Sequence, residues 1–179
     1  AHVAALDASK AMVEIITQRF GDAVIARQHD LAEPISWLGD ASMDIVVSSL
    51  TLHYLRDWSV PLSEFRRVLK SDGRLVMSTH HPAMVQQLLV SGQSYFDTVL
   101  VEDRWRVGGV EHEVRYYHRP LQDILNSIIA AGFTIRRIIE PHLTQPLRGV
   151  PAEWFQKLST LPWFLIVEAC VTKAADHPL

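Results

Sequence analysis

Cysteine is nearly absent from this chain of 179 residues: the one example is Cys170, so no disulfide can form within the chain. A chain without internal disulfides is typical of a reducing compartment, and we expect a cytoplasmic protein. Positive charge is not in excess either, because 17 Lys and Arg stand against 20 Asp and Glu, a formal net charge of -3. This balance argues against a nucleic-acid partner. Apolar runs fall short of the roughly 18 residues of a membrane span, which argues against a membrane partner.

The sequence does contain short apolar runs that alternate with amphipathic segments. We expect strands over 2–6, 24–30, 43–50, 74–79, 133–139 and 164–172, and helices over 9–20, 63–69 and 121–131. Strands that alternate with helices predict an α/β fold of Rossmann-like type, with a doubly wound and mostly parallel sheet, in a single domain over 1–179.

Two segments break this alternation. Residues 83–119 form a long insert after the fourth strand, and the stretches on either side of Val107-Gly108-Gly109 predict a β-hairpin within it. The Pro-rich stretch 141–162 shows no clear helical crossover, so we expect the last strand to return antiparallel beside its predecessor. The sequence KSDGRL at 70–75 predicts a turn into the fourth strand.

Acidic residues stand at the ends of the first two predicted strands. In open α/β sheets, ligands bind at the carboxyl ends of the strands. There Asp7 can accept both hydroxyls of a ribose, and Asp30 with the backbone N–H of Leu31 can bind the edge of an adenine. Met12, one turn into the following helix, can lie on the adenine face, although methionine more often packs in a core. Capping of a helix or turn is the alternative role for either acid.

Histidines follow the third and fourth predicted strands. The third ends at Ser48 and Ser49 and runs into LTLHYLRDW, which contains His53, and the fourth ends in STHHP with His80 and His81. Neighbouring side chains on a strand point in opposite directions, so His80 and His81 do not form a metal-binding pair. No second cluster of metal ligands accompanies them, and we predict no metal site. A lone histidine such as His53 is more often an ordinary surface or core residue than a functional one.

The order of several stretches resembles class I S-adenosylmethionine-dependent methyltransferases, most of all their small-molecule group. These stretches are LDASKAM, ARQHDLAEPI, MDIVVSSLTLHYLRDW, LSEFRRVLKSDGRLVMSTHHP and AAGF. The resemblance spans residues 3–79 and, less closely, 115–139, where YYHRPLQDILNSIIAAGF is similar to bacterial members. It implies a cofactor, S-adenosyl-L-methionine, a product, S-adenosyl-L-homocysteine, and a small-molecule substrate.

The resemblance also implies roles for individual residues. Its cofactor contacts are Asp7 on the ribose hydroxyls, Ala8 and Met12 flanking the adenine, Asp30 and Leu31 on the adenine edge, and Ser48 and Leu50 along the methionine part. His53 and Tyr54 face the methyl acceptor, and His53 is the first candidate for a base, with His80 or His81 behind it. Tyr54, Tyr117 and other aromatic side chains form a wall near the sulfonium, because aromatic faces attract cations. Packing in the core or the insert is the alternative for each of them.

One part of the family pattern is missing. Its first strand and glycine-rich loop belong roughly twenty residues before Asp7, by analogy with the dinucleotide fingerprint. Without that strand, the strands starting near Val3 and Ile45 each present an unpaired edge. We therefore expect the domain to be N-terminally incomplete in this sequence, and we expect the exposed edges to favour a homodimer.

The expected reaction is methyl transfer by in-line displacement, in which alignment of the acceptor supplies much of the rate. A base is needed only where the acceptor loses a proton, and the acceptor atom stays open among O, N, C and S. The 83–119 insert is expected to cover the substrate pocket. Two alternatives remain: a non-catalytic Rossmann-like binding or scaffold protein, and an NAD-dependent oxidoreductase, which also places an acid at the second strand end.

Overall fold

The computed structural model describes residues 2–172. Its strands are β1 (Val3–Asp7), β2 (Val24–Gln28), β3 (Met43–Ser49), β4 (Leu69–His80), β5 (Val99–Val107), β6 (Val110–His118), β7 (Phe133–Ile139) and β8 (Phe164–Val171). Its α-helices are α1 (Lys10–Phe20), α2 (Ser59–Val68), α3 (Pro82–Val85), α4 (Leu121–Ala130) and α5 (Ala152–Thr160). Short 3₁₀ turns lie at Gly21–Ala23, Leu52–Tyr54 and Gln86–Leu88. The predicted α/β fold is therefore confirmed.

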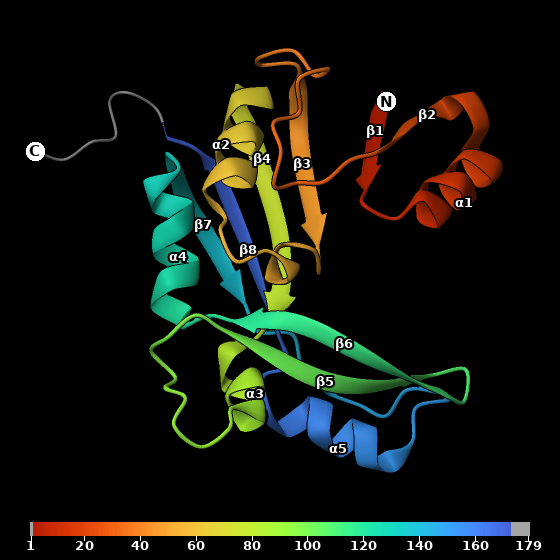
Figure 1. The fold of residues 1–179 in the computed structure, drawn as a ribbon, viewed down its shortest axis with the longest axis vertical. Helices are drawn as coiled ribbons and strands as arrows, with labels where there is room; N and C mark the ends of the chain where they lie inside the picture. The colour runs from red at the N-terminus through yellow and green to blue at the C-terminus, as the bar shows by residue number, and fades with distance from the viewer. Residues whose placement is uncertain (1, 173–179) are drawn as a thin grey trace, which may run out of the picture.

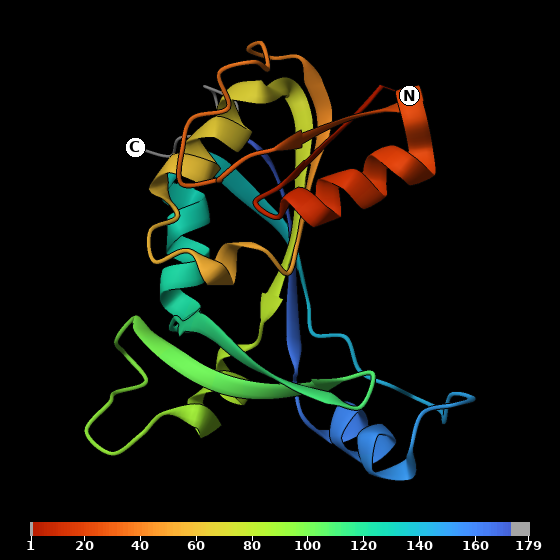
Figure 2. The same ribbon diagram turned by 45° about the vertical axis from the view of Figure 1, so that its right-hand side comes forward.

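The main sheet has the strand order β3-β4-β8-β7. β3 and β4 are parallel, whereas β8 runs antiparallel to both of its neighbours, as expected for the last strand. Helices α2 and α4 cover one side of this sheet, and α1 lies on the other side, against the separate parallel pair β1-β2 (Figures 1 and 2). The arrowheads of β1, β3 and β4 all point toward the β5-β6 hairpin (Figure 1), so the carboxyl ends of these strands share one end of the molecule.

Local sequence signals explain the first βαβ unit. The hydroxyl of Ser9 accepts a hydrogen bond from the backbone N–H of Met12 and caps α1, and Gly21 ends the helix with a φ of 52°. A positive φ is costly for residues with a side chain and nearly free for glycine. The helix therefore begins and ends where the sequence predicts.

Arg67 holds the long connection from β2 to β3. Its guanidinium donates to the carbonyl oxygens of Ile35 (2.9 Å) and Leu38 (2.8 Å) and pairs with Glu64 and Asp40, both at 2.7 Å. The carboxylate of Glu64 in turn accepts from the backbone N–H of Ile35 at 2.7 Å. Planar donors of this kind suit several acceptors at once, so one side chain orders a segment without regular structure.

Three element boundaries differ from the sequence prediction. Helix α2 begins at Ser59 rather than residue 63, because the Asp57 carboxylate accepts from the backbone N–H of Ser59 at 2.8 Å and starts the helix earlier. Strand β4 includes the predicted turn, since the β3-β4 register shifts between Met43 and Ile45 and residues 70–73 form an irregularity within the strand. The second predicted strand ends at Gln28, before Asp30.

Helix α5 is a further difference, because the sequence between β7 and β8 predicts no helix. The prolines of this stretch flank the helix rather than interrupt it: Pro151 stands at its N-cap position and Pro162 follows its end. Proline is tolerated at these positions because the N–H that it lacks has no intrahelical partner there. The connection still returns β8 antiparallel to β7.

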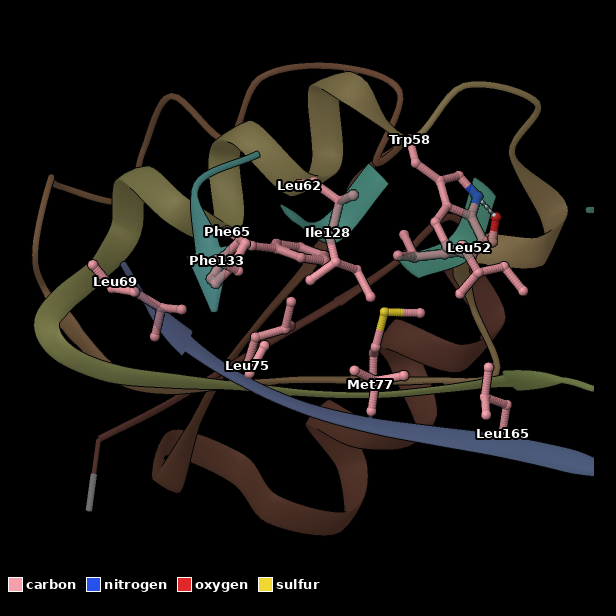
Figure 3. Packing of buried hydrophobic residues seen from close by; sticks show 14 of the residues in the cluster. Leu52, Trp58, Leu62, Phe65, Leu69, Leu75, Met77, Ile128, Phe133 and Leu165 are labelled. Atoms are coloured by element: carbon pink, nitrogen blue, oxygen red, sulfur yellow. Dashed lines mark hydrogen bonds between the residues drawn. The ribbon is translucent and has the colours of Figure 1, made fainter. Parts of the chain in front are cut away.

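The main core lies between the sheet and helices α2 and α4. Figure 3 shows Leu62 and Phe65 of α2 facing Leu75 and Met77 of β4, and all four side chains are buried. Close packing of this kind makes each buried methylene count toward stability. The helix-covered side of the sheet therefore forms the hydrophobic core, whereas the residues at the carboxyl ends of the strands lie outside this core and can bind a ligand.

The β1-β2 pair is not hydrogen-bonded to β3 in the part of the chain that the structure describes. A groove of about 390 Å³ separates β1 from β3 and has Leu6, Met43 and Val46 among its lining residues. Apolar side chains at the edge of β3 face solvent, with Val47 69% exposed. The unpaired edges expected near Val3 and Ile45 are therefore present among the described strands.

The predicted hairpin is confirmed within the insert. β5 and β6 are antiparallel and meet at Gly108 and Gly109, whose φ values are 59° and 84°. Two successive positive φ values match the turn that suits the right-handed twist of a hairpin. The hairpin crosses the molecule beyond the carboxyl ends of the main sheet (Figure 1). Among residues 2–172, no helix combines the length and apolar character that a bilayer crossing needs.

Candidate functional site

A pocket of about 310 Å³ opens where β1, β2 and β3 end, and we call it the strand-end pocket. Its lining residues come from these strand ends and the loops that follow them: Leu6, Asp7, Ala8, His29, Asp30, Leu31, Ser49, Leu50, Thr51, Tyr54 and Leu55. The fold thus brings six of the site residues suggested by the sequence into one cavity. Met12 is exposed on α1 outside this lining, and the buried Ser48 lines the neighbouring groove instead.

Both acids of the strand-end pocket hold a turn with one oxygen. Asp7 Oδ1 accepts from the backbone N–H of Ser9 at 2.8 Å, and Asp30 Oδ1 accepts from the N–H of Ala32 at 2.9 Å. The capping role considered from the sequence is therefore real for both. It does not exclude ligand binding, because a carboxylate has two oxygens and about four acceptor positions. The turn fixes the orientation of each carboxylate beside the pocket.

Leu50 has an unusual backbone in the strand-end pocket. Its φ is 49°, and its N–H donates to both the carbonyl oxygen (3.1 Å) and the hydroxyl (3.2 Å) of Ser78 on β4. A leucine in this left-handed region costs about 1–2 kcal/mol. Strain of this kind persists where the surroundings impose it, and it clusters at functional sites. No signal in the sequence identifies this strain or the part that Ser78 plays in holding it.

A stack of rings leads from the pocket into the protein. The ring of Tyr54, half-exposed at the pocket, lies 4.2 Å from the ring of His53, and the His53 ring stacks on that of His80 at 4.4 Å between centroids and 19° between planes. His53 is 2% exposed and His80 is 8% exposed. The chain therefore brings together the two histidines that the sequence suggests as catalytic, from β4 and from the loop after β3.

Both histidines of the stack are neutral. Burial, with a smaller contribution from His80, lowers the pKa of His53 to about 3. Burial also lowers the pKa of His80, against the opposing effect of Asp103. Both ring nitrogens of His53 and Nδ1 of His80 are buried without a hydrogen-bond partner in the described structure. An unsatisfied buried polar group costs about 1–3 kcal/mol of folding free energy. The two imidazoles therefore destabilise the fold, and their ring nitrogens remain available for hydrogen bonds.

The hairpin closes over the histidine pair. The fully buried ring of Tyr116 meets His80 edge-on at 4.7 Å and His53 at 5.5 Å, and Trp105 lies 5.6 Å from His80. The hydroxyl of Tyr116 and the indole N–H of Trp105 both donate to Oδ2 of Asp103, at 3.0 Å and 2.7 Å. Burial and then Asp103 raise the pKa of Tyr116, which stays protonated. The sequence analysis did not identify Asp103 or Trp105.

His81 and Tyr117 lie elsewhere. Nδ1 of His81 accepts from the backbone N–H of Ala83 at 3.1 Å and caps α3, while its Nε2 lies 2.8 Å from Glu140 Oε1, outside hydrogen-bond direction. Burial lowers the pKa of His81, and Glu140 opposes this. Tyr117 follows Tyr116 on β6, so the pleat turns it to the opposite face of the hairpin. The fold does not bring these two side chains to the ring stack.

Arg119 holds the loop that contains the ring stack. Its Nη2 donates to the carbonyl oxygen of Arg56 at 2.6 Å, and its guanidinium lies 4.6 Å from the centre of the Trp58 ring. The indole N–H of Trp58 donates to the carbonyl of Leu52 at 2.7 Å. Burial lowers the pKa of Arg119. The start of α4 and the loop bearing His53 are thereby fixed to each other.

The strand-end pocket has a definite electrostatic character. Its lining contains two carboxylates, a tyrosine and no Lys or Arg. Larger cavities of about 500 Å³ beside the hairpin and about 650 Å³ around Arg74 and Arg137 lack this convergence of acids on strand ends. A ligand with ribose and adenine hydrogen-bond donors and a positive centre fits the pocket. No cluster of three or more His, Cys, Asp or Glu placed for a metal occurs within residues 2–172.

Comparison with known proteins agrees with this chemistry. Residues 1–77 match the family model of a methyltransferase domain. The chain aligns over 155 residues, at 26% identity, with an uncharacterized protein from Haemophilus influenzae; this covers 76% of the chain and 57% of that protein. The chain therefore spans little more than half the length of this relative.

Solved structures give the same fold. A proposed S-adenosylmethionine-dependent methyltransferase from Listeria monocytogenes superposes with a TM-score of 0.76 at 22% identity, over 96% of this chain and 80% of that one. An S-adenosylmethionine-dependent methyltransferase from Mesorhizobium loti gives 0.67 at 25% identity, over 94% and 80%.

These likenesses define the architecture as a Rossmann-like α/β fold of the kind found in methyltransferases. Residues 1–77 match a methyltransferase domain model, and the described chain shares the fold of S-adenosylmethionine-dependent methyltransferases, as the sequence resemblance implied. Both solved structures are named as S-adenosylmethionine-dependent enzymes, in agreement with the cofactor that the sequence resemblance implies.

Proposed function

We propose that this protein binds S-adenosylmethionine in the strand-end pocket and transfers its methyl group to a small-molecule acceptor. The observation that supports this most is the convergence of Asp7, Asp30, Leu31, Leu50 and Tyr54 in one pocket at the strand ends. Each of these residues matches a position of the family motif in sequence, and the fold gathers them although they come from separate loops.

The proposed cofactor contacts follow from the chemistry of the lining. Asp7 accepts the two ribose hydroxyls, and Asp30 with the N–H of Leu31 holds the adenine edge. Ala8 borders the adenine, and Leu50 borders the methionine part. The roles suggested for Met12 and Ser48 stay predictions, because these side chains lie outside the strand-end pocket. The ring of Tyr54 is the aromatic surface available to a cationic sulfur.

The proposed reaction is an in-line displacement. When bound, S-adenosylmethionine supplies a methyl group on a sulfonium: the acceptor's lone pair bonds to the methyl carbon while the carbon–sulfur electron pair returns to sulfur. The protein's contribution is alignment, which can supply several kcal/mol of the barrier. Tyr54 lines the pocket and orients the acceptor there, and the buried His53 ring supports it from behind at 4.2 Å.

His53 has a limited acid–base role in this proposal. With a pKa of about 3, its imidazole is neutral and is a weak base at physiological pH. Both of its ring nitrogens are buried, so the role of His53 as a base that faces the acceptor stays a prediction. His80 lies behind it in the stack, as the sequence suggested. This arrangement suits an acceptor whose nucleophilic atom reacts in its neutral form. The roles suggested for His81 and Tyr117 stay predictions.

The two alternative functions make different demands on the same pocket. An NAD-dependent oxidoreductase also uses an acid at the second strand end but has no need for an aromatic ring beside a cationic sulfur, whereas Tyr54 lines this pocket. A scaffold protein requires neither the paired acids nor the strained Leu50. We further propose a cytoplasmic protein of bacterial type, a single methyltransferase-like domain with a substrate-covering insert at 83–119, and a homodimer formed through the exposed sheet edges.

Calorimetric titration with S-adenosylhomocysteine tests the proposal. We expect binding by the wild-type protein and a loss of at least tenfold in affinity for Asp7→Ala. Asp22→Ala, which changes an exposed acid after α1, is the matched control and keeps the wild-type affinity. NAD titrated in parallel is expected to show no binding. A folded protein that binds NAD and not S-adenosylhomocysteine would contradict the proposal, and one that binds neither would favour the scaffold function.

A further inference from the structure

One charged side chain lies on the packing face of the hairpin. Alternate positions of β5 and β6 share this face, and they hold Val99, Val101, Asp103, Trp105, His112, Val114, Tyr116 and His118. Asp103 is the acidic member of an otherwise apolar and aromatic set. The opposite face holds the mixed charges, such as the pair of Glu102 with Arg115 at 3.0 Å. A charge on the packing face breaks the binary pattern, and such breaks are expected at functional positions.

The carboxylate of Asp103 accepts three hydrogen bonds, two of them from aromatic side chains. Its Oδ2 accepts from the indole of Trp105 at 2.7 Å and from the hydroxyl of Tyr116 at 3.0 Å, and its Oδ1 accepts from the backbone N–H of Arg104 at 2.7 Å. Hydrogen bonds to an ionised acceptor are about twice as strong as neutral ones. One carboxylate therefore sets the positions of two aromatic rings.

Those two rings are the ones that meet the histidine pair. Tyr116 presents its edge to His80 and His53, at 80° and 83° to their planes, and Trp105 is tilted against His80 at 59°. Edge-to-face contact fixes the relative orientation of rings as well as their distance. Because ring nitrogens of both histidines have no partner, neighbouring rings rather than hydrogen bonds hold the imidazoles in place.

We propose that Asp103 is a positioning residue for the His53–His80 pair and acts through Tyr116 and Trp105. It touches neither the strand-end pocket nor any of its lining residues by hydrogen bond. Its effect is to fix the positions of Tyr116 and Trp105 against the rings of His53 and His80. The catalytic meaning of this inference rests on the proposed methyl transfer, whereas the positioning itself does not.

The test compares Asp103→Ala, Asp103→Asn and Tyr116→Phe with a matched control, Glu102→Gln, which lies next to Asp103 on the opposite face of β5. The readout is the NMR spectrum of histidine labelled in the ring, with S-adenosylhomocysteine affinity measured on the same samples. We expect Asp103→Ala to move the ring signals of His53 and His80 beyond their linewidth. Tyr116→Phe should move the same signals, and Asp103→Asn should move them less, because one amide oxygen still accepts a hydrogen bond.

The control should leave both signals in place, and S-adenosylhomocysteine affinity should stay within about twofold throughout. Unmoved histidine signals in folded Asp103→Ala would overturn the proposal, as would equal movement in Glu102→Gln. If Asp103→Ala does not fold, Tyr116→Phe and Asp103→Asn give the decision by the same signals. Wild-type protein that fails to bind S-adenosylhomocysteine would sink the proposed function alone, because the histidine spectra still decide the role of Asp103.

Discussion

The buried neutral state of His53 predicts a specific weakness in acid. Its pKa is about 3 in the folded protein against 6.5 for the free side chain. Below pH 6.5 the unfolded chain takes up a proton at this position that the folded protein does not. The unfolded state therefore binds more protons, and the free energy of unfolding decreases as the pH is lowered. The contribution is fully present above pH 6.5 and is lost progressively down to about pH 3.

The magnitude follows from the same two values. One pKa unit corresponds to about 1.36 kcal/mol, so lowering the pH from 7.5 to 5 removes about 2 kcal/mol from the free energy of unfolding through His53 alone. His53→Phe keeps an aromatic ring in the stack and removes the titration. We therefore expect this variant to lose about 2 kcal/mol less than the wild type over the same interval.

Urea denaturation at pH 7.5 and pH 5 measures this difference. His112→Gln, a change of an exposed side chain near the end of the hairpin, serves as the control and should keep the wild-type acid loss. His80 and His81 are present in all three proteins, so the difference between the wild type and His53→Phe reports on His53. Equal acid losses in these two proteins would refute the argument that His53 is buried and neutral.

Two further predictions concern the scaffold around the site. Ile128→Ala should lower the free energy of unfolding by about 2–5 kcal/mol, because Ile128 is fully buried, whereas Ile129→Ala, 54% exposed on the same helix, should lower it by less than about 1 kcal/mol. Thermal unfolding separates the two variants, and equal shifts in melting temperature would contradict the packing of α4. Arg119→Lys should cost about 1–2 kcal/mol, because an ammonium cannot reproduce the guanidinium's bonds to backbone carbonyls over Trp58. Arg106→Lys, a change of an exposed hairpin residue, is its control. A comparable decrease in the free energy of unfolding in that variant would contradict the stabilising role given to Arg119.

Much of the fold could be predicted because its signals are local. Ser9 and Gly21 mark the ends of α1, and Gly108 with Gly109 marks the hairpin turn, since capping and positive φ depend on the residues themselves. The boundaries that failed depend on distant partners. β4 continues through 70–73 because β3 pairs on both sides of the irregularity. No local pattern of apolar or turn residues conveys such a pairing.

Some residues of the candidate site could likewise be predicted from local sequence, and others could not. Asp7 and Asp30 could be identified because a strand end followed by an acid is visible in sequence. The opposite directions of His80 and His81 also follow from strand alternation, although Glu140, the charged neighbour of His81, lies 59 positions away along the chain. Asp103 could be suspected only once the pairing of β5 with β6 showed which face it occupies. Its partners Tyr116 and Trp105 become meaningful only after the hairpin is placed against the ring stack.

The central claim is that the strand-end pocket binds the cofactor through Asp7, Asp30 and the N–H of Leu31. The most direct measurement is the change in backbone amide NMR signals of the wild-type protein when S-adenosylhomocysteine is added. The account predicts saturable shifts that are largest at Ala8, Leu31 and Leu50, with the amides of the Arg74–Arg137 cavity unmoved. Absence of saturable shifts, or shifts confined to residues outside the strand-end pocket, would contradict it.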